Sequence, residues 1–293
     1  MAVQTVAVVG AGFMGSGIAQ VCAQAGHTVR LIDADAAQID KARKSIEWSV
    51  GRFVSKGVIE GSVESILGRV AFGTSFDAAR EADFVIEAVY EDAGVKKSVW
   101  SKLDGICGAQ TILGSNTSTI PISLLAAATT RPGQFVGIHF FGPVPMMRLV
   151  EVIRGQKTTD DTLNATVAFA RGLGKNPIVV NKDVPGFLMN RIFGAMGCEA
   201  IRLVEAGVGR VEDIDQGMVD GFNFRMGPLS IADLSGLDIA YNAFRVMHEM
   251  DPEIMPAPPK LLERLVQEGK LGVKTGEGFY KYDAAGKKIG PAF

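Results

Sequence analysis

Two polar side chains, His139 and Glu151, interrupt runs of apolar residues that have the composition of buried strands. His139 lies in segment 136–141 (Val-Gly-Ile-His-Phe-Phe), and Glu151 lies in segment 149–153 (Leu-Val-Glu-Val-Ile). A carboxylate buried in such a run is costly unless it is paired, and a histidine twelve residues away is a suitable partner. An imidazole that is oriented by a carboxylate can act as a general base near neutral pH. We therefore interpret the pair as a candidate base, and a purely structural buried pair is the alternative.

A glycine-rich segment supplies the second candidate site. Residues 10–15 read Gly-Ala-Gly-Phe-Met-Gly and follow a strand-like run, so Gly10 allows a tight turn, Gly12 lets the backbone approach a pyrophosphate and Gly15 allows a helix to pack on the strand. Asp33 ends the next strand-like run, where its carboxylate can bind both hydroxyls of a ribose. The same pattern occurs at FAD sites and in turns that bind nothing. Because Asp33 would repel a ribose 2′-phosphate and no basic residue follows it directly, NAD is favoured over NADP.

The elements that must position these residues follow from the periodicity of the chain. Short β-branched runs alternate with helical patterns up to about residue 181, which is typical of a doubly wound parallel sheet. From Gly186 onward the pattern is helical only, and the turn at residues 183–186 marks the change. We predict an α/β Rossmann-type doubly wound sheet in residues 1–184, followed by an all-α C-terminal domain in residues 185–293. The predicted strands are 3–9, 28–33, 84–89, 111–115, 135–140, 149–153 and 177–181, and the predicted helices are 14–25, 36–51, 163–173, 187–206, 211–220, 228–250 and 260–268.

Composition excludes several classes of protein. The chain has 293 residues, 47% of them hydrophobic and 21% charged, with a formal net charge of −2, which does not fit a nucleic-acid or acidic-membrane binder. No apolar stretch reaches the roughly 18 residues of a membrane span, and the first strand-like run leaves no room for a secretory signal. The three cysteines, an odd number without a short pairing, fit reduced thiols better than disulfides or a metal site. We expect a soluble cytoplasmic protein without a metal.

Six motifs, in this order, resemble the L-3-hydroxyacyl-CoA dehydrogenase family, including its bacterial 3-hydroxybutyryl-CoA dehydrogenases. The resemblance covers essentially the whole chain. The motifs are Val-Gly-Ala-Gly-Phe-Met-Gly at 9–15, Val-Ile-Glu-Ala-Val at 85–89, Ser-Asn-Thr-Ser at 115–118, His-Phe-Phe-Gly-Pro-Val-Pro at 139–145, Asp-Val-Pro-Gly-Phe at 183–187 and Lys-Thr-Gly-Glu-Gly-Phe-Tyr at 274–280.

The resemblance implies a reversible, NAD-dependent oxidation of an L-3-hydroxyacyl-CoA to the 3-oxoacyl-CoA, in fatty-acid breakdown or short-chain acyl metabolism. In that reaction His139 is the general base, Glu151 orients it, and Ser118 and Asn190 hold substrate oxygens. Without the resemblance, Ser118 reads as a turn or cap residue and Asn190 as a first-turn helix residue.

The resemblance also assigns binding residues. Those implied near the cofactor are Gly10, Gly12, Phe13, Met14, Gly15, Asp33, Glu91, Lys96, Asn116 and Lys274. Ser49 and Lys56 match positions that contact the coenzyme A nucleotide, although a lysine on a helix is usually a solvated surface charge. The helical domain resembles the family's dimerisation domain, which implies a homodimer, and its apolar stripe at Ile201, Val204 and Val208 is explained equally well by core packing.

One residue departs from the family pattern. After His139-Phe140-Phe141 the family usually places an asparagine, and this chain has Gly142, which removes an amide close to the reacting centre. Two alternative functions therefore stay open: a dehydrogenase of a hydroxy acid that is not a coenzyme A ester, and a non-catalytic NAD-binding protein on the same scaffold.

Overall fold

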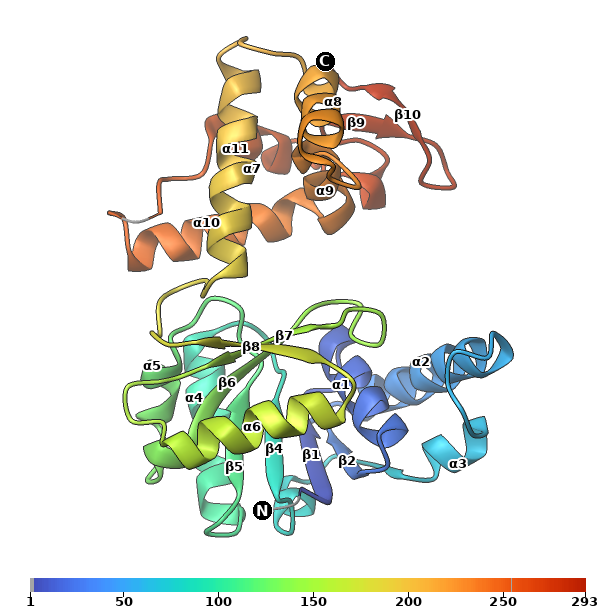
Figure 1. The fold of residues 1–293 in the computed structure, drawn as a ribbon, viewed down its shortest axis with the longest axis vertical. Helices are drawn as coiled ribbons and strands as arrows, with labels where there is room; N and C mark the ends of the chain where they lie inside the picture. The colour runs from blue at the N-terminus through green and yellow to red at the C-terminus, as the bar shows by residue number, and fades with distance from the viewer. Residues whose placement is uncertain (1–2, 254) are drawn as a thin grey trace. The chain divides into compact units, whose positions relative to one another are not determined.

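The computed structural model describes residues 3–253 and 255–293. The chain divides into two compact units, Met1–Val184 and Pro185–Phe293, and each is described here by itself. Figure 1 shows a sheet flanked by helices in the first unit and a group of helices in the second.

The first unit is built on one eight-stranded sheet with the strand order β3-β2-β1-β4-β5-β6-β7-β8 (Figure 1). All neighbouring strands are parallel except β6 and β7, which are antiparallel. The predicted Rossmann-type sheet is confirmed, but it is a mixed sheet rather than a wholly parallel one. The strands are β1 (Thr5–Val9), β2 (Thr28–Ile32), β3 (Val70–Gly73), β4 (Phe84–Glu87), β5 (Ile112–Ser115), β6 (Phe135–Phe140), β7 (Leu149–Ile153) and β8 (Asn176–Val180).

Helices cover both faces of this sheet, as a doubly wound fold requires. They are α1 (Phe13–Gln24), α2 (Ala36–Ser55), α3 (Val63–Leu67), α4 (Ala93–Ile106), α5 (Ile122–Ala126) and α6 (Asp160–Gly172), with short 3₁₀ helices η1 (Phe76–Ala79) and η2 (Pro132–Gln134). Side chains of α1 and α6, such as Ile18 and Phe169, join strand residues in one buried core. On the other face, Trp100 of α4 packs edge-on against Phe135 of β6, with 4.8 Å between the ring centroids.

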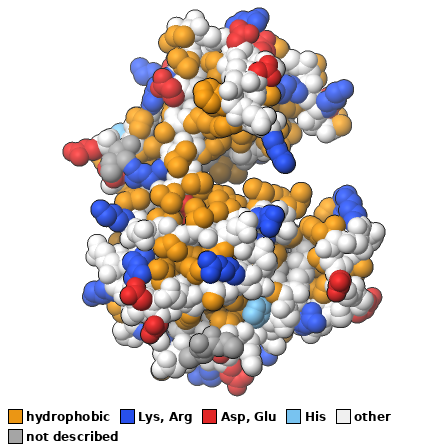
Figure 2. Space-filling view, viewed as in Figure 1, with side chains coloured by type: hydrophobic (Ala, Val, Ile, Leu, Met, Phe, Trp, Pro, Cys, Tyr) orange, Lys and Arg blue, Asp and Glu red, His pale blue; other side chains and the backbone are white. Residues whose placement is uncertain are grey.

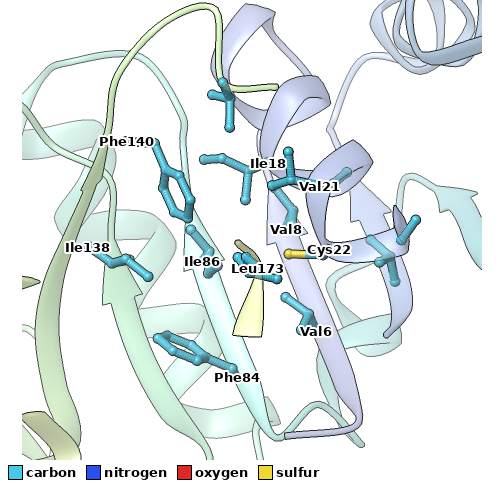
Figure 3. Close-up of a cluster of buried hydrophobic side chains, with 14 of the residues drawn as sticks. Val6, Val8, Ile18, Val21, Cys22, Phe84, Ile86, Ile138, Phe140 and Leu173 are labelled. Carbon is cyan, nitrogen blue, oxygen red and sulfur yellow. The ribbon is translucent and has the colours of Figure 1, made fainter. Parts of the chain in front are cut away.

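The core beneath α1 and α6 determines where the polar strand residues point. Figure 3 shows Phe84 and Ile86 of β4 and Ile138 and Phe140 of β6 in this core, beside Ile18. Successive side chains of a strand point to opposite faces of the sheet. Glu87, which follows Ile86 on β4, and His139, which lies between Ile138 and Phe140 on β6, therefore point to the opposite face of the sheet. That face is covered by α4 and α5.

The second unit is mainly helical, as predicted. Its elements are α7 (Met189–Glu205), α8 (Val211–Phe222), α9 (Pro228–Ser235), α10 (Leu237–Met250), α11 (Lys260–Gln267), η3 (Val273–Thr275), β9 (Tyr280–Tyr282) and β10 (Lys288–Pro291). Cys198, Leu229, Phe244, Leu262 and Phe279 are among the residues of its buried core.

Two details of the second unit correct the sequence analysis. The predicted single helix 228–250 is two helices, α9 and α10, because Gly236 between them has φ 98°, which a helix interior does not allow. The unit also contains an antiparallel pair, β9 and β10, which the pattern did not reveal because the strands have three and four residues. Buried Asp233 of α9 accepts the backbone amides of Phe279 and Tyr280, both at 2.9 Å, and so fastens β9 to the helices.

Candidate active site

His139 and Glu151 form a buried pair across two strands. They are direct partners in the antiparallel register of β6 and β7, so their side chains share one face of the sheet. His139 Nδ1 lies 2.8 Å from Glu151 Oε2, and the residues are 4% and 0% exposed. The ring of Phe141 lies against the imidazole at 4.5 Å between centroids. A carboxylate at this distance can orient an imidazole, which is the arrangement that a general base requires.

The other two histidines have structural contacts. His27 stacks on Phe169 with 5.3 Å between ring centroids, and burial lowers its pKa below the ordinary value. His248 Nδ1 lies 2.7 Å from the carbonyl oxygen of Met255 within the second unit. His139 is thus the histidine that is paired with a carboxylate in the described part of the chain.

The loop that follows β5 is bound to the strand that carries His139. Asn116 Oδ1 accepts the backbone amide of Phe140 at 2.8 Å, so the residue next to His139 is fixed from this loop. The backbone amide of Ser118 donates to Glu91 Oε1 at 2.7 Å, and Thr119 donates to the same oxygen at 3.0 Å. Asn116 and Ser118 are thereby held on the same sheet edge as the histidine pair.

A buried charge network supports that loop. Lys96, 1% exposed, binds Glu87 Oε1 at 2.6 Å and Glu91 Oε2 at 3.2 Å, and Ser115 Oγ donates to Glu87 Oε2 at 2.7 Å. Burial raises the pKa of Glu91, but the Lys96 ammonium, the Thr117 hydroxyl and two backbone amides together hold it below the ordinary value. Glu91 and Lys96 therefore act within the protein on the loop that carries Ser118.

Glu87, which is 0% exposed at the end of β4, is a buried carboxylate that was not among the predicted site residues. The signal that singled out Glu151, a lone carboxylate in an apolar strand, is equally present in Val-Ile-Glu-Ala-Val at 85–89. The buried partner Lys96 is nine residues away on α4, which is not visible as a pattern in the sequence.

The glycine-rich turn between β1 and α1 has the geometry that a dinucleotide requires. Gly10 has φ 102°, and a Cβ there would lie 2.5 Å from the carbonyl oxygen of Ala88. A Cβ on Gly15 would lie 1.7 Å from the carbonyl oxygen of Gly10, so the helix packs closely on the turn. A Cβ on Gly12 would meet nothing within 4 Å. Gly12, at the N-cap of α1, thus borders open space from which a pyrophosphate can approach the backbone.

Side chains fix the turn from β2 and α2. Asp33 Oδ2, at the end of β2, accepts the backbone amide of Ala11 at 2.7 Å. The carbonyl oxygen of Ala11 accepts hydrogen bonds from Ser16 Oγ at 3.0 Å and from Gln38 Nε2 at 3.1 Å. Phe13 and Met14 begin α1 directly after the turn. This turn fits an adenine dinucleotide, and the Asp33 carboxylate beside it lies where the pattern predicts a partner for a ribose.

Ser49 and Lys56 line a cavity of about 560 Å³ in the first unit. Ser49 lies on α2 and Lys56 is its C-cap, and the helix reaches Ser55 rather than ending at residue 51 as predicted. Its lining also contains Phe13 and residues 143–146, in the loop that follows the strand of His139. The cavity is therefore bounded both by α2 and by the loop after β6.

Two predicted site residues belong to the second unit. Asn190 lies in the first turn of α7, where the sequence analysis expected it. Lys274 lies in η3 and its Nζ binds Asp238 Oδ1 at 2.6 Å. Both assignments stay predictions from the family resemblance.

The described residues contain no group of three or more His, Cys, Asp or Glu that could hold a metal ion. In the same residues, no helix has the length and hydropathy that crossing a membrane would need.

Family models match almost the whole chain. Residues 5–184 match the NAD binding domain of 3-hydroxyacyl-CoA dehydrogenase, and residues 186–282 match its C-terminal domain. The chain belongs to the 3-hydroxyacyl-CoA dehydrogenase family. The predicted family and the predicted cofactor NAD are confirmed, and the protein is an NAD-dependent oxidoreductase.

Similar proteins agree with this membership. A probable 3-hydroxybutyryl-CoA dehydrogenase of Deinococcus radiodurans is 45% identical over 277 residues, which are 94% of this chain and 99% of that protein. The crystal structure of FadB2 of M. tuberculosis superposes with a TM-score of 0.92 at 41% identity, covering 97% of this chain and 100% of the other. The crystal structure of the (S)-3-hydroxybutyryl-CoA dehydrogenase PaaH1 of Ralstonia eutropha superposes with a TM-score of 0.91 at 41% identity. The match covers 96% of this chain and 100% of the other.

Proposed function

We propose that the protein catalyses the reversible oxidation of a short-chain L-3-hydroxyacyl-CoA, such as 3-hydroxybutyryl-CoA, to the 3-oxoacyl-CoA. The observation that carries the proposal is the buried pair of His139 and Glu151, 2.8 Å apart, in a chain of this family. Relatives of similar length that are named 3-hydroxybutyryl-CoA dehydrogenases support the choice of substrate.

His139 takes the proton of the substrate's 3-hydroxyl group in this mechanism. Glu151 accepts the hydrogen on Nδ1, which makes Nε2 the nitrogen of the neutral ring that receives the proton. The carboxylate then stabilises the imidazolium that forms, as in other pairs of base and orienting acid. In the reverse direction the same imidazolium returns the proton to the 3-oxo oxygen.

A bound NAD would supply the acceptor for the hydride of the third carbon of the acyl chain. We assign its pyrophosphate to the turn of Gly10, Gly12 and Gly15 and its adenosine ribose to Asp33. We assign Asn116, in the loop after β5, to the cofactor side of the site, and Glu91 and Lys96 to the support of that loop from within the protein. Lys274 is assigned to the cofactor from the resemblance alone.

The substrate is held at both ends. Ser118 and Asn190 bind oxygens near the reacting carbon, and Ser49 and Lys56 bind the nucleotide of coenzyme A. For Ser49 and Lys56 the support is their common cavity. The assignment of Ser118 is supported by the hydrogen bond from its backbone amide to Glu91, which fixes the loop that carries it.

We further propose a cytoplasmic homodimer. Cys22, Cys107 and Cys198 are buried free thiols, which fits a reducing compartment. The second unit, the counterpart of the family's dimerisation domain, exposes Ile192 and Phe222 at 64% and 71%, and Figure 2 shows hydrophobic side chains on its surface.

The test is the loss of NADH absorbance with acetoacetyl-CoA, beside free acetoacetate and beside NADPH. We expect rapid NADH consumption with the thioester and little with the free acid or with NADPH. Turnover of the free acid alone would favour the dehydrogenase of a substrate without coenzyme A that Gly142 suggests. Binding of NADH without turnover of either would favour the non-catalytic protein.

A further inference from the structure

Trp48 is an exposed tryptophan on the wall of a cavity. It is 65% exposed on α2, whereas the other tryptophan, Trp100, is 0% exposed in the core. Trp48 lines the cavity of about 560 Å³ together with Phe13, which is 70% exposed. Large aromatic surfaces left open at a cavity commonly mark a binding surface.

Arg52 is stacked on this tryptophan. Its guanidinium carbon lies 5.1 Å from the centroid of the Trp48 ring, within cation–π distance. The two residues are four apart on α2, so they are neighbours on one helix face. Ser49 and Lys56 also line the cavity from this helix, which places an aromatic ring, a hydroxyl and two cations together.

The charged side chains that line the cavity are all positive. Arg52 and Lys56 are the charged residues among the described residues that line it, and none of that lining is a carboxylate. A ligand that fits this wall has anionic groups for the cations and a flat ring for Trp48. A nucleotide has both.

The cavity shares Phe13 with the dinucleotide segment but includes none of the three glycines of its turn. Asp33, the ribose partner at that turn, does not line it, whereas residues 143–146 after the strand of His139 do. The nucleotide that reaches Trp48 is thus the one attached to the substrate.

We propose that Trp48 stacks on the adenine of coenzyme A while Arg52 binds its phosphates, so that both residues select coenzyme A thioesters over thioesters without a nucleotide. The inference rests on the proposed function. It adds two recognition residues, Trp48 and Arg52, to the assignment of Ser49 and Lys56.

The kinetic test compares acetoacetyl-CoA with the acetoacetyl thioester of N-acetylcysteamine, which has the same reacting group and no nucleotide. We expect Trp48→Leu to lower kcat/KM for the coenzyme A ester about tenfold or more, and Arg52→Gln to lower it about three- to tenfold. Neither variant should change kcat/KM for the short thioester. Equal losses with both thioesters, or no loss with either, would overturn the inference.

Arg43→Gln is the matched control. Arg43 is also an arginine of α2 stacked on an aromatic ring, 4.1 Å from the centroid of Phe72, but it does not line the cavity. The ratio of kcat/KM for the two thioesters should stay at the wild-type value in this variant. A loss as large as that of Arg52→Gln would mean that the effect comes from the charge of the helix, and would overturn the role of Arg52.

A second measurement does not depend on turnover. Coenzyme A without an acyl group should quench the emission of Trp48 in the wild-type protein, and Trp48→Phe should abolish the quenching because Trp100 is buried. Quenching that persists in Trp48→Phe would overturn the inference. The absence of any quenching by coenzyme A in a wild-type protein that reduces acetoacetyl-CoA would also overturn it. Failure of the proposed function appears separately, as absence of NADH consumption with acetoacetyl-CoA.

Discussion

Asn116 Oδ1 accepts the backbone amide of Phe140 at 2.8 Å, which joins the loop after β5 to the residue that follows His139. Both residues are buried, at 7% and 1% exposure, so water does not readily replace the bond. The side chain of an asparagine in the loop after β5 therefore fixes the backbone next to His139 on β6.

Replacing Asn116 by leucine leaves the amide of Phe140 without this acceptor. We expect the free energy of unfolding to fall by about 1–3 kcal/mol and kcat to fall with it. Asn116→Asp keeps an acceptor for the amide of Phe140 but adds a charge at a buried site, so its stability should approach that of wild type only in acid, where the carboxyl is neutral. Urea denaturation and the rate of NADH consumption measure the two effects, and equal stability of Asn116→Leu and wild type would contradict the role of this bond.

Removing either member of the histidine pair should stop catalysis without stopping cofactor binding. His139→Gln should lower kcat by about 10²–10⁴, the usual contribution of a positioned general base. Glu151→Gln should cause a similar loss, because a neutral amide can donate its NH2 group to Nδ1, which favours the tautomer with the hydrogen on Nε2, and because it cannot stabilise the imidazolium. NADH binding, followed by fluorescence, should stay at the wild-type level in both.

The double variant tests whether the two residues act as one unit. The losses of His139→Gln and Glu151→Gln should be far from additive, since Glu151 acts through the ring that the first change removes. Fully additive losses would place Glu151 in an independent role.

Much of the fold follows from local pattern. The strand runs around His139 and Glu151 are long and β-branched, so their existence could be predicted, and their pairing followed from the cost of a buried carboxylate. Strand β3 (Val70–Gly73) was missed because its four residues end in glycine and form no long apolar run. The break at Gly236 was missed because a helical period continues on both sides of it.

The cavity could not be predicted from the sequence. Trp48 and residues 143–146 are about a hundred positions apart, and their approach depends on how α2 and the loop after β6 pack on α1. Exposure was equally invisible, since a tryptophan in a helical pattern is usually part of the core. The family resemblance assigned Ser49 and Lys56 but gave no reason to consider Trp48.

The stability of the first unit should depend on acid through Asp104. Burial raises the pKa of this carboxyl, but the hydrogen bonds from Thr130 and the bond and charge of Arg131 lower the pKa by more. The pKa of Asp104 therefore lies below the ordinary value. The Asp104 carboxylate accepts the Thr130 amide, the Thr130 hydroxyl and Arg131 Nε, each at 2.8 Å. A carboxyl with a lowered folded-state pKa adds stability above its unfolded pKa of about 3.9, and this stability is lost as the pH falls through the folded-state value.

Asp104→Asn should therefore be less stable than wild type by about 1–3 kcal/mol at pH 7, and the difference should shrink below about pH 4. Urea denaturation at the two pH values measures it. Asp77→Asn is the control, because Asp77 pairs with Arg80 at the surface, where the side chains are 70% and 63% exposed. A difference that grows in acid would contradict the assignment.

Gly142 and Phe13 should behave as a coupled pair. A Cβ at position 142 would lie 2.7 Å from Phe13 Cε1, so the asparagine that the family usually has here does not fit beside this ring. Phe13 is 70% exposed and its ring can turn away, so the new side chain should change the cavity wall without unfolding the protein. Gly142→Asn should thus lower kcat/KM for acetoacetyl-CoA about tenfold with little change in Tm.

The second change, Phe13→Leu, removes the ring that blocks the new side chain. In the double variant we expect kcat/KM to recover part of the loss, with a coupling free energy of about 1–2 kcal/mol in the double-mutant cycle. The cycle is measured from NADH consumption at varied acetoacetyl-CoA for the wild type, both single variants and the double variant. Strictly additive effects would mean that the absence of a side chain at position 142 is unrelated to the phenylalanine at the start of α1.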